Sequence, residues 1–123
     1  MARILIAEDE PDIRDLIEFT LKYVGHDVVS VSNGEEAYRL AKKLKPDLIL
    51  LDVRMPVMSG YEACKLIKND PETSHIPVVF LSAKGQSSEI KAGLEAGAVD
   101  YLLKPFAPGD LNRRIKEILE GSV

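Results

Sequence analysis

Four apolar segments of this 123-residue chain each end in a polar group of a kind that binds ions or reacts. Two end in carboxylates, Glu8 with Asp9 and Asp52, and the others end in the hydroxyl of Ser82 and the ammonium of Lys104. A carboxylate directly after large aliphatic residues indicates that the chain leaves the core there, because burying an unpaired charge is costly. Taken singly, each group can be explained as a cap or a strand end.

Taken together, these groups favour chemistry at phosphorus. Three carboxylates repel one another, so a cation must offset them at neutral pH. Lys104 offsets one charge, and the remainder suits Mg²⁺, a hard cation that takes oxygen ligands, with Mn²⁺ as a substitute. A metal ion and a lysine beside one carboxylate neutralise a phosphoryl group while that carboxylate attacks phosphorus in line. The pattern predicts that Asp52 becomes an acyl phosphate and that Ser82 donates a hydrogen bond to it.

The elements that must gather these groups alternate between strand and helix. The predicted strands are 3–7, 27–31, 47–52, 76–81 and 99–103, and the predicted helices are 11–24, 34–43, 59–68, 87–96 and 108–119. This alternation predicts one domain over residues 1–123, a three-layer α/β/α fold with a five-stranded parallel sheet. Five strands suit the flavodoxin-like (βα)5 order 2-1-3-4-5, with the less apolar second strand at an edge. That order brings the carboxyl ends of strands 1, 3, 4 and 5 to one rim.

Composition excludes several classes of function. The net charge of −4 and the pI near 5.2 argue against direct nucleic-acid binding, which needs a basic patch. The single cysteine, Cys64, excludes a disulfide framework and is expected to be a partly buried hydrophobe. No apolar stretch reaches the length of a membrane span and no leader precedes the first strand, so we expect a cytoplasmic protein.

The chain resembles the receiver domains of two-component response regulators, of the chemotaxis-regulator type, across essentially its whole length. The matching motifs are Glu8-Asp9, Leu50-Leu51-Asp52-Val53-Arg54-Met55-Pro56 with Gly60 beyond, Ser82-Ala83, and Tyr101-Leu102-Leu103-Lys104-Pro105-Phe106. Each motif is weak alone, but their order and spacing are highly specific. The resemblance implies that a sensor histidine kinase or a phosphotransfer protein donates its phosphohistidine phosphoryl group, and that the domain catalyses its own phosphorylation and dephosphorylation.

The resemblance also implies a role for each site residue. Asp9, Asp52 and the backbone carbonyl of Arg54 ligate Mg²⁺, and Glu8 acts through a metal-bound water. Lys104 pairs with the phosphoryl group, and its peptide bond to Pro105 is expected to be cis. Ser82 and Tyr101 are the switch residues, which move towards the phosphoryl group and inward, respectively.

The implied output is a changed surface on the fourth helix, fifth strand and fifth helix, read by a downstream effector or a fused output domain. The segments 93–101 and 113–115 resemble receivers with a winged-helix output, which dimerise on phosphorylation through charged pairs. Asp100, Glu95 and Arg114 match those pairs, whereas apolar Ile90 and Val99 replace polar positions.

Two finer hypotheses concern the edges of the site. The kinase is expected to dock on Asp12, Ile13 and Leu16, together with Phe106 and Pro108 after the fifth strand. Arg54 and Lys84 each lie two residues beyond a site residue and are expected to shield the phosphoryl group and prolong its lifetime, although both could simply extend into solvent.

Three alternatives compete with this interpretation. An aspartate-nucleophile phosphohydrolase wants a second aspartate two residues after the first, where Arg54 stands. A degenerate receiver that only docks would not need the intact set of acids, serine and lysine. A flavin-binding protein needs a phosphate-binding loop after the first strand, where Glu8 and Asp9 would repel phosphate.

Overall fold

The computed structural model describes residues 2–82, 87–104 and 107–121. Its strands are β1 (Arg3–Ala7), β2 (Asp27–Val31), β3 (Leu48–Asp52), β4 (Val78–Ser82) and β5 (Asp100–Leu103). Its helices are α1 (Pro11–Tyr23), α2 (Gly34–Leu44), α3 (Gly60–Asn69), α4 (Ser87–Glu95) and α5 (Pro108–Leu119). The alternation of strand and helix predicted from the sequence is therefore present along the whole described chain.

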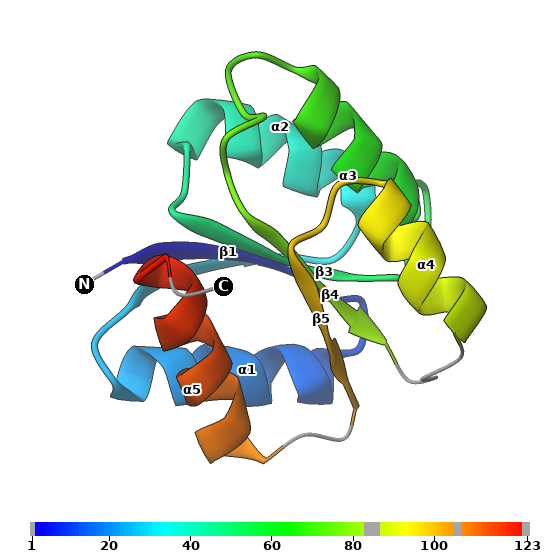
Figure 1. Cartoon of the computed structure of the whole chain (residues 1–123). Helices are drawn as coiled ribbons and strands as arrows, with labels where there is room; N and C mark the ends of the chain where they lie inside the picture. The colour runs from blue at the N-terminus through cyan, green and yellow to red at the C-terminus, as the bar shows by residue number, and fades with distance from the viewer. Residues whose placement is uncertain (1, 83–86, 105–106, 122–123) are drawn as a thin grey trace.

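The five strands form one parallel sheet in the order β2-β1-β3-β4-β5, which confirms the predicted topology (Figure 1). β2 is at an edge, as its weaker apolar run predicted. β3 and β4 are interior and every one of their residues is buried, so both strands are apolar up to their last residue. β4 begins two residues later than predicted and includes Ser82 as its last residue.

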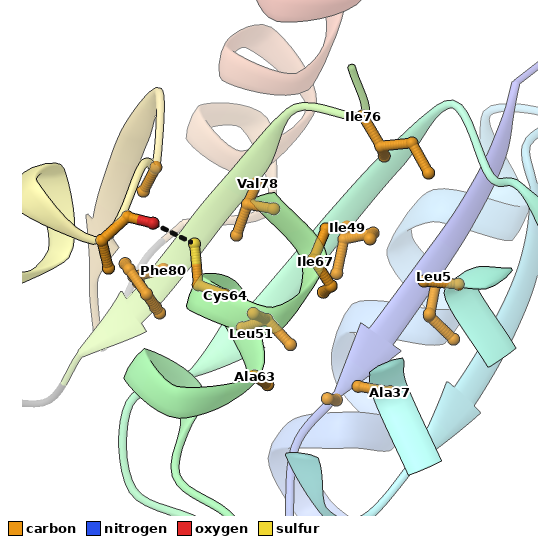
Figure 2. Packing of buried hydrophobic residues seen from close by; sticks show 14 of the residues in the cluster. Leu5, Ala37, Ile49, Leu51, Ala63, Cys64, Ile67, Ile76, Val78 and Phe80 are labelled. Atoms are coloured by element: carbon orange, nitrogen blue, oxygen red, sulfur yellow. Dashed lines mark hydrogen bonds between the residues drawn. The ribbon is translucent and has the colours of Figure 1, made fainter. Parts of the chain in front are cut away.

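Helices cover both faces of the sheet because successive strand residues point to opposite faces. On one face, α2, α3 and the turn after α4 pack against residues such as Leu51 and Phe80 (Figure 2). On the other face, α1 and α5 pack against the alternate set, which includes Leu50 and Leu81. Figure 1 shows this division, with α2, α3 and α4 on one side of the strands and α1 and α5 on the other.

Cys64 lies in the first of these cores and is more buried than predicted. Its exposed fraction is 0%, and its Sγ donates a hydrogen bond to the Ala96 carbonyl at 3.3 Å (Figure 2). Burial raises the pKa of the thiol to about 11, so Cys64 stays protonated at neutral pH. It therefore acts as a small core residue that ties α3 to the turn after α4.

Candidate functional site

The first acid of the site is held rigidly at the end of β1. Glu8 is completely buried, and its backbone N–H donates to the Val31 carbonyl of β2 at 3.1 Å. Its Oε2 accepts a hydrogen bond from the backbone N–H of Glu10 at 3.2 Å, at the start of α1. Asp9 follows it and is exposed. The turn therefore directs one carboxylate inward and leaves the next accessible from solvent.

Asp52 is the last residue of β3 and is only 6% exposed. It is aligned with Leu81 of β4, and the next backbone N–H, that of Val53, donates to the Leu81 carbonyl at 3.1 Å. The following loop is close-packed as well, since a Cβ on Gly60 would lie 2.2 Å from the Asp52 carbonyl oxygen. The position of the Asp52 backbone is therefore fixed from both sides.

Lys104, the residue directly after β5, provides positive charge to the site. Its Nζ lies 2.6 Å from Glu8 Oε1 and 3.3 Å from Asp52 Oδ1, and its side chain is 10% exposed. The backbone N–H of Lys104 donates to the Ser82 carbonyl at 2.8 Å, which fixes the residue beside β4. The predicted meeting of the first, third and fifth strands at one rim is thus present in the structure.

Three acids form the remainder of the site. Glu8, Asp9 and Asp52 each offer one carboxylate oxygen, and these oxygens lie within 4.8 Å of one another. An all-oxygen set of this kind fits a hard divalent cation such as Mg²⁺, which binds one or two carboxylates and retains several waters. The donor chemistry therefore fits the ion predicted from the sequence.

The electrostatics show how strongly the acids oppose one another. Burial, together with the hydrogen bond and the charge of Glu8, raises the pKa of Asp52 to about 7, and Lys104 acts in the opposite direction. Burial alone would lower the pKa of Lys104, but Glu8 and Asp52 outweigh it and the net shift is upward. One lysine cannot neutralise three carboxylates, so the site carries an excess of negative charge that a cation would relieve.

Ser82 and Tyr101, the predicted switch pair, lie on neighbouring strands. Ser82 is 4% exposed at the end of β4. Tyr101 lies on β5, where it is aligned with Phe80 of β4. It is half-buried and packs against the core that contains α3. Both residues are thus close to the rim that carries Asp52.

The structure describes only some of the residues predicted to dock the kinase or to shield the phosphoryl group. Asp12 is exposed, Ile13 is half-buried against the α1–α5 core, and Leu16 is 46% exposed. Arg54 is exposed at the start of the loop after β3. The predictions for Ala83, Lys84, Pro105 and Phe106, and for the side chains of Ile90 and Pro108, lie outside the described residues.

Two of the charged residues that were predicted to pair between subunits, Arg114 and Asp100, form an ion pair with each other within one chain. Arg114 Nη1 of α5 lies 3.1 Å from Asp100 Oδ2 of β5. Val99, just before β5, is 40% exposed. A dimer that used Arg114 and Asp100 would therefore have to exchange this contact for an intersubunit one.

One residue of the site was missed from the sequence. Arg14, in the first turns of α1, donates from Nη1 to the Glu8 carbonyl at 2.9 Å. This contact braces the turn that carries Glu8 and Asp9. A lone arginine in an amphipathic helix gives no sequence signal for such a role, because the contact depends on how α1 packs over the end of β1.

Comparison with known proteins decides the family. The family model described as "Response regulator receiver domain" matches residues 4–116. The chain is a response regulator receiver domain. Within the described residues of this receiver domain, no helix has the length and apolar character that a bilayer span requires.

Curated relatives of the receiver domain are transcriptional regulators. The alkaline phosphatase synthesis transcriptional regulatory protein PhoP of Bacillus subtilis (strain 168) is 42% identical over 120 residues, which are 98% of this chain and 49% of PhoP. The phosphate regulon transcriptional regulatory protein PhoB of Pseudomonas aeruginosa is 41% identical over 94% of this chain and 51% of PhoB. The receiver domain thus spans about half the length of these relatives.

Solved structures share the whole fold of the receiver domain. A putative response regulator from Chloroflexus aurantiacus J-10-fl has a TM-score of 0.93 and 39% identity, and the match covers 97% of this chain and 98% of that one. The receiver domain of the sensor histidine kinase PA1611 from Pseudomonas aeruginosa PAO1 has a TM-score of 0.91 and 34% identity, over 97% and 98% of the two chains. That structure has a magnesium ion coordinated in its active-site cleft.

Proposed function

We propose that residues 1–123 form a phosphorylation-activated switch in which Asp52 accepts a phosphoryl group from the phosphohistidine of a sensor histidine kinase or a phosphotransfer protein. The observation that carries this proposal is the meeting of Glu8, Asp9 and Asp52 within 4.8 Å, with the Lys104 ammonium 3.3 Å from Asp52. Membership of the receiver family supports it.

In this mechanism Asp9, Asp52 and the Arg54 backbone carbonyl would hold Mg²⁺, or Mn²⁺ in its place, and Glu8 would act through a water. When bound, the ion would supply positive charge that neutralises the phosphoryl oxygens. Asp52, in its ionised form, attacks phosphorus; the new O–P bond forms as the P–N bond to the donor histidine breaks, and the imidazole keeps the electron pair. Lys104 stabilises the added negative charge, since its Nζ already lies between Glu8 and Asp52.

Phosphorylation then changes the α4–β5–α5 surface. The phosphoryl group carries nearly two negative charges where ionised Asp52 carried one, and it brings three strong acceptors beside Ser82. We propose that the Ser82 hydroxyl donates to one of these oxygens and that Tyr101 follows inward, which biases the surface read by an effector or a fused output domain. The half-buried position of Tyr101 on β5 supports this role.

The phosphodonor docks, in this proposal, on Asp12, Ile13 and Leu16 with Phe106 and Pro108. Exposure of Asp12 and Leu16 supports the assignment for α1.

A small-molecule phosphodonor tests the central step. Incubation with acetyl phosphate and Mg²⁺ is expected to add one phosphoryl group by intact mass, and the addition is lost in Asp52→Asn and in excess chelator. Asp27→Asn, which removes an exposed aspartate of β2, is the matched control and retains the adduct. Turnover of the donor without an adduct would instead support a phosphohydrolase, and no reaction at all would support a module that only docks.

The lifetime of the acyl phosphate is a separate prediction. If Arg54 and Lys84 shield it from water, Arg54→Asn and Lys84→Glu are each expected to accelerate dephosphorylation several-fold. Loss of radiolabel after removal of the donor measures the rate. Unchanged rates in both variants would show that these side chains do not shield the site.

A further inference from the structure

A pocket of about 400 Å³ lies at the amino ends of β1 and β2, between the end of α1 and helix α5. Apolar Ala2, Val24 and Leu119 form part of its wall, and Figure 1 shows the last turns of α5 beside the start of β1. Asp52 lies at the opposite end of the sheet, roughly 15 Å away, because each of these strands is five residues long. The pocket is therefore separate from the acidic site.

Two neutral polar side chains, His26 and Asn112, interrupt the apolar wall of the pocket. Both residues are half-buried, and His26 Nδ1 and Asn112 Oδ1 are shielded from solvent with no hydrogen-bond partner among the described residues. Shielded polar atoms without partners cost folding free energy, and native proteins contain few of them. Each of the two atoms belongs to a planar group whose last torsion is soft, so rotation of that group can present the atom to the pocket.

The chemistry of these two atoms indicates what a ligand must supply. The Asn112 Oδ1 atom is a hydrogen-bond acceptor. Burial lowers the pKa of His26, so its imidazole is neutral at pH 7 and one ring nitrogen is an acceptor. A ligand with an N–H or O–H group would satisfy an acceptor that the fold leaves without a partner.

The charges of the pocket favour no net charge on the ligand. Lys116 and Glu120 also line it, and both are exposed on the same side of α5, one turn apart. Because their charges are opposite, the pocket attracts an anion no better than a cation. An uncharged ligand fits these surroundings best.

The volume of the pocket sets the size of the ligand. A cavity of about 150 Å³ holds one benzene ring, so about 400 Å³ accommodates two fused rings with substituents. Pockets of this size with an apolar wall and a few polar groups are typical of small-molecule sites. We propose that the pocket binds an uncharged bicyclic aromatic molecule whose N–H or O–H group donates a hydrogen bond to Asn112 Oδ1, with His26 as the neighbouring acceptor.

Indole tests this site because it has two fused rings and a single N–H donor, and N-methylindole is the matched probe without the donor. Titration followed by amide NMR spectra is expected to show saturable shifts at His26, Asn112 and Leu119. One hydrogen bond contributes about 2–10-fold in affinity, so indole is expected to bind more tightly than N-methylindole by that factor. Equal dissociation constants, shifts centred on the rim around Asp52, or no saturable shift with indole would overturn the proposal.

Asn112→Leu tests the acceptor, because it replaces the amide by an apolar group of similar size. The variant is expected to lose the preference for indole and to bind N-methylindole at least as tightly as the wild type does. It is also expected to resist urea at least as well as the wild type, since it removes an acceptor without a partner. A folded variant that still prefers indole would show that Asn112 does not accept the hydrogen bond and would overturn the assignment.

Val24→Trp tests the pocket itself by filling it from the end of α1. Val24 is 39% exposed, so a larger side chain can be accommodated, and indole binding is expected to weaken more than tenfold. Leu94→Trp, at a residue that is 51% exposed on α4, is the matched control and is expected to bind indole normally. Unchanged binding in Val24→Trp, or an equal loss in Leu94→Trp, would show that indole binds elsewhere.

The proposal is independent of phosphoryl transfer, and one variant separates the two. Asp52→Asn forms no adduct with acetyl phosphate in the proposed function, but it is expected to bind indole with the wild-type dissociation constant. A large loss of indole binding in Asp52→Asn would contradict a separate site at the amino ends of the strands.

Discussion

Burial and negative charge oppose each other at the Asp52 carboxylate. It is 6% exposed, faces Glu8, and shares the Lys104 ammonium with Glu8 as a counter-charge. The raised pKa means that the metal-free folded protein holds the Asp52 proton more tightly than the unfolded chain does. Ionising Asp52 therefore costs folding free energy unless a cation is bound.

This cost has a definite sign with pH. Because the pKa rises from 3.8 to about 7 on folding, the contribution of Asp52 to stability falls as pH rises between these values and is constant above them. In chelator, Asp52→Asn is expected to have a larger free energy of unfolding than the wild type, by about 1–3 kcal/mol at pH 8 and by much less at pH 4. Urea denaturation at the two pH values measures the difference.

Asp27→Asn removes an exposed carboxylate and serves as the control for net charge. Equal stabilisation by both variants would show that the gain comes from net charge and not from burial of Asp52.

Arg14 gives a second prediction at this scale, because its contact with the Glu8 carbonyl positions two acids at once. Arg14→Met is expected to weaken Mg²⁺ binding about tenfold, as losses of supporting contacts around metal ligands do. Isothermal titration calorimetry measures the constant. The control is Arg113→Met, which also removes one positive charge, from the exposed side of α5. If it weakens Mg²⁺ binding as much as Arg14→Met does, the effect of Arg14 comes from its charge at long range and not from its contact with Glu8.

At the scale of elements, close packing of the loop after β3 fixes Asp52 as firmly as the sheet does. α3 begins with a capping box in which Ser59 and Glu62 satisfy each other's backbone N–H groups. The Gly60 N–H donates to the Val53 carbonyl at 2.9 Å. The helix therefore starts directly against the end of the strand and leaves no room for a side chain.

Substitution of glycines tests this packing. Gly60→Ala is expected to destabilise the fold by more than about 2 kcal/mol in urea denaturation, because its Cβ would meet a backbone oxygen of Asp52. Gly109→Ala, in α5, places a Cβ where nothing lies within 4 Å and is expected to gain about 0–1 kcal/mol. Similar effects for the two variants would show that the loop can move away from Asp52.

The sequence predicted the elements better than it predicted these contacts. Unbroken apolar runs identify β3 and β4 because both of their faces are buried, and a polar residue marks each strand end at the rim. The direct pairing of Glu8 with Lys104 depends on side-chain depth, which spacing does not determine. Val57 is another case: its φ of 68°, spanned by a hydrogen bond from Met58 N–H to the Pro56 carbonyl, is unexpected for a β-branched residue.

For the whole molecule, the acids make stability depend on cations. Mg²⁺ at ten times its dissociation constant is expected to stabilise the fold by about 1.4 kcal/mol, since it binds only the folded state. For a domain of this size the thermal midpoint should rise by about 5 °C. Circular dichroism melts with Mg²⁺ and with chelator measure the difference.

Asp9→Asn is expected to abolish this shift and still fold, because Asp9 is exposed. An unchanged shift in the variant would place the stabilising ion elsewhere on the surface.

The ion pair between Glu8 and Lys104 joins the residue after β1, the first strand along the chain, to the residue after β5, the last strand along the chain. A ribosome adding about 5–20 residues per second completes Lys104 roughly 5–20 s after Glu8. During that interval the buried acid has no lysine to pair with, and the rim that holds Asp52 is incomplete. A nascent chain therefore cannot form the complete site until β5 and Lys104 have been synthesised.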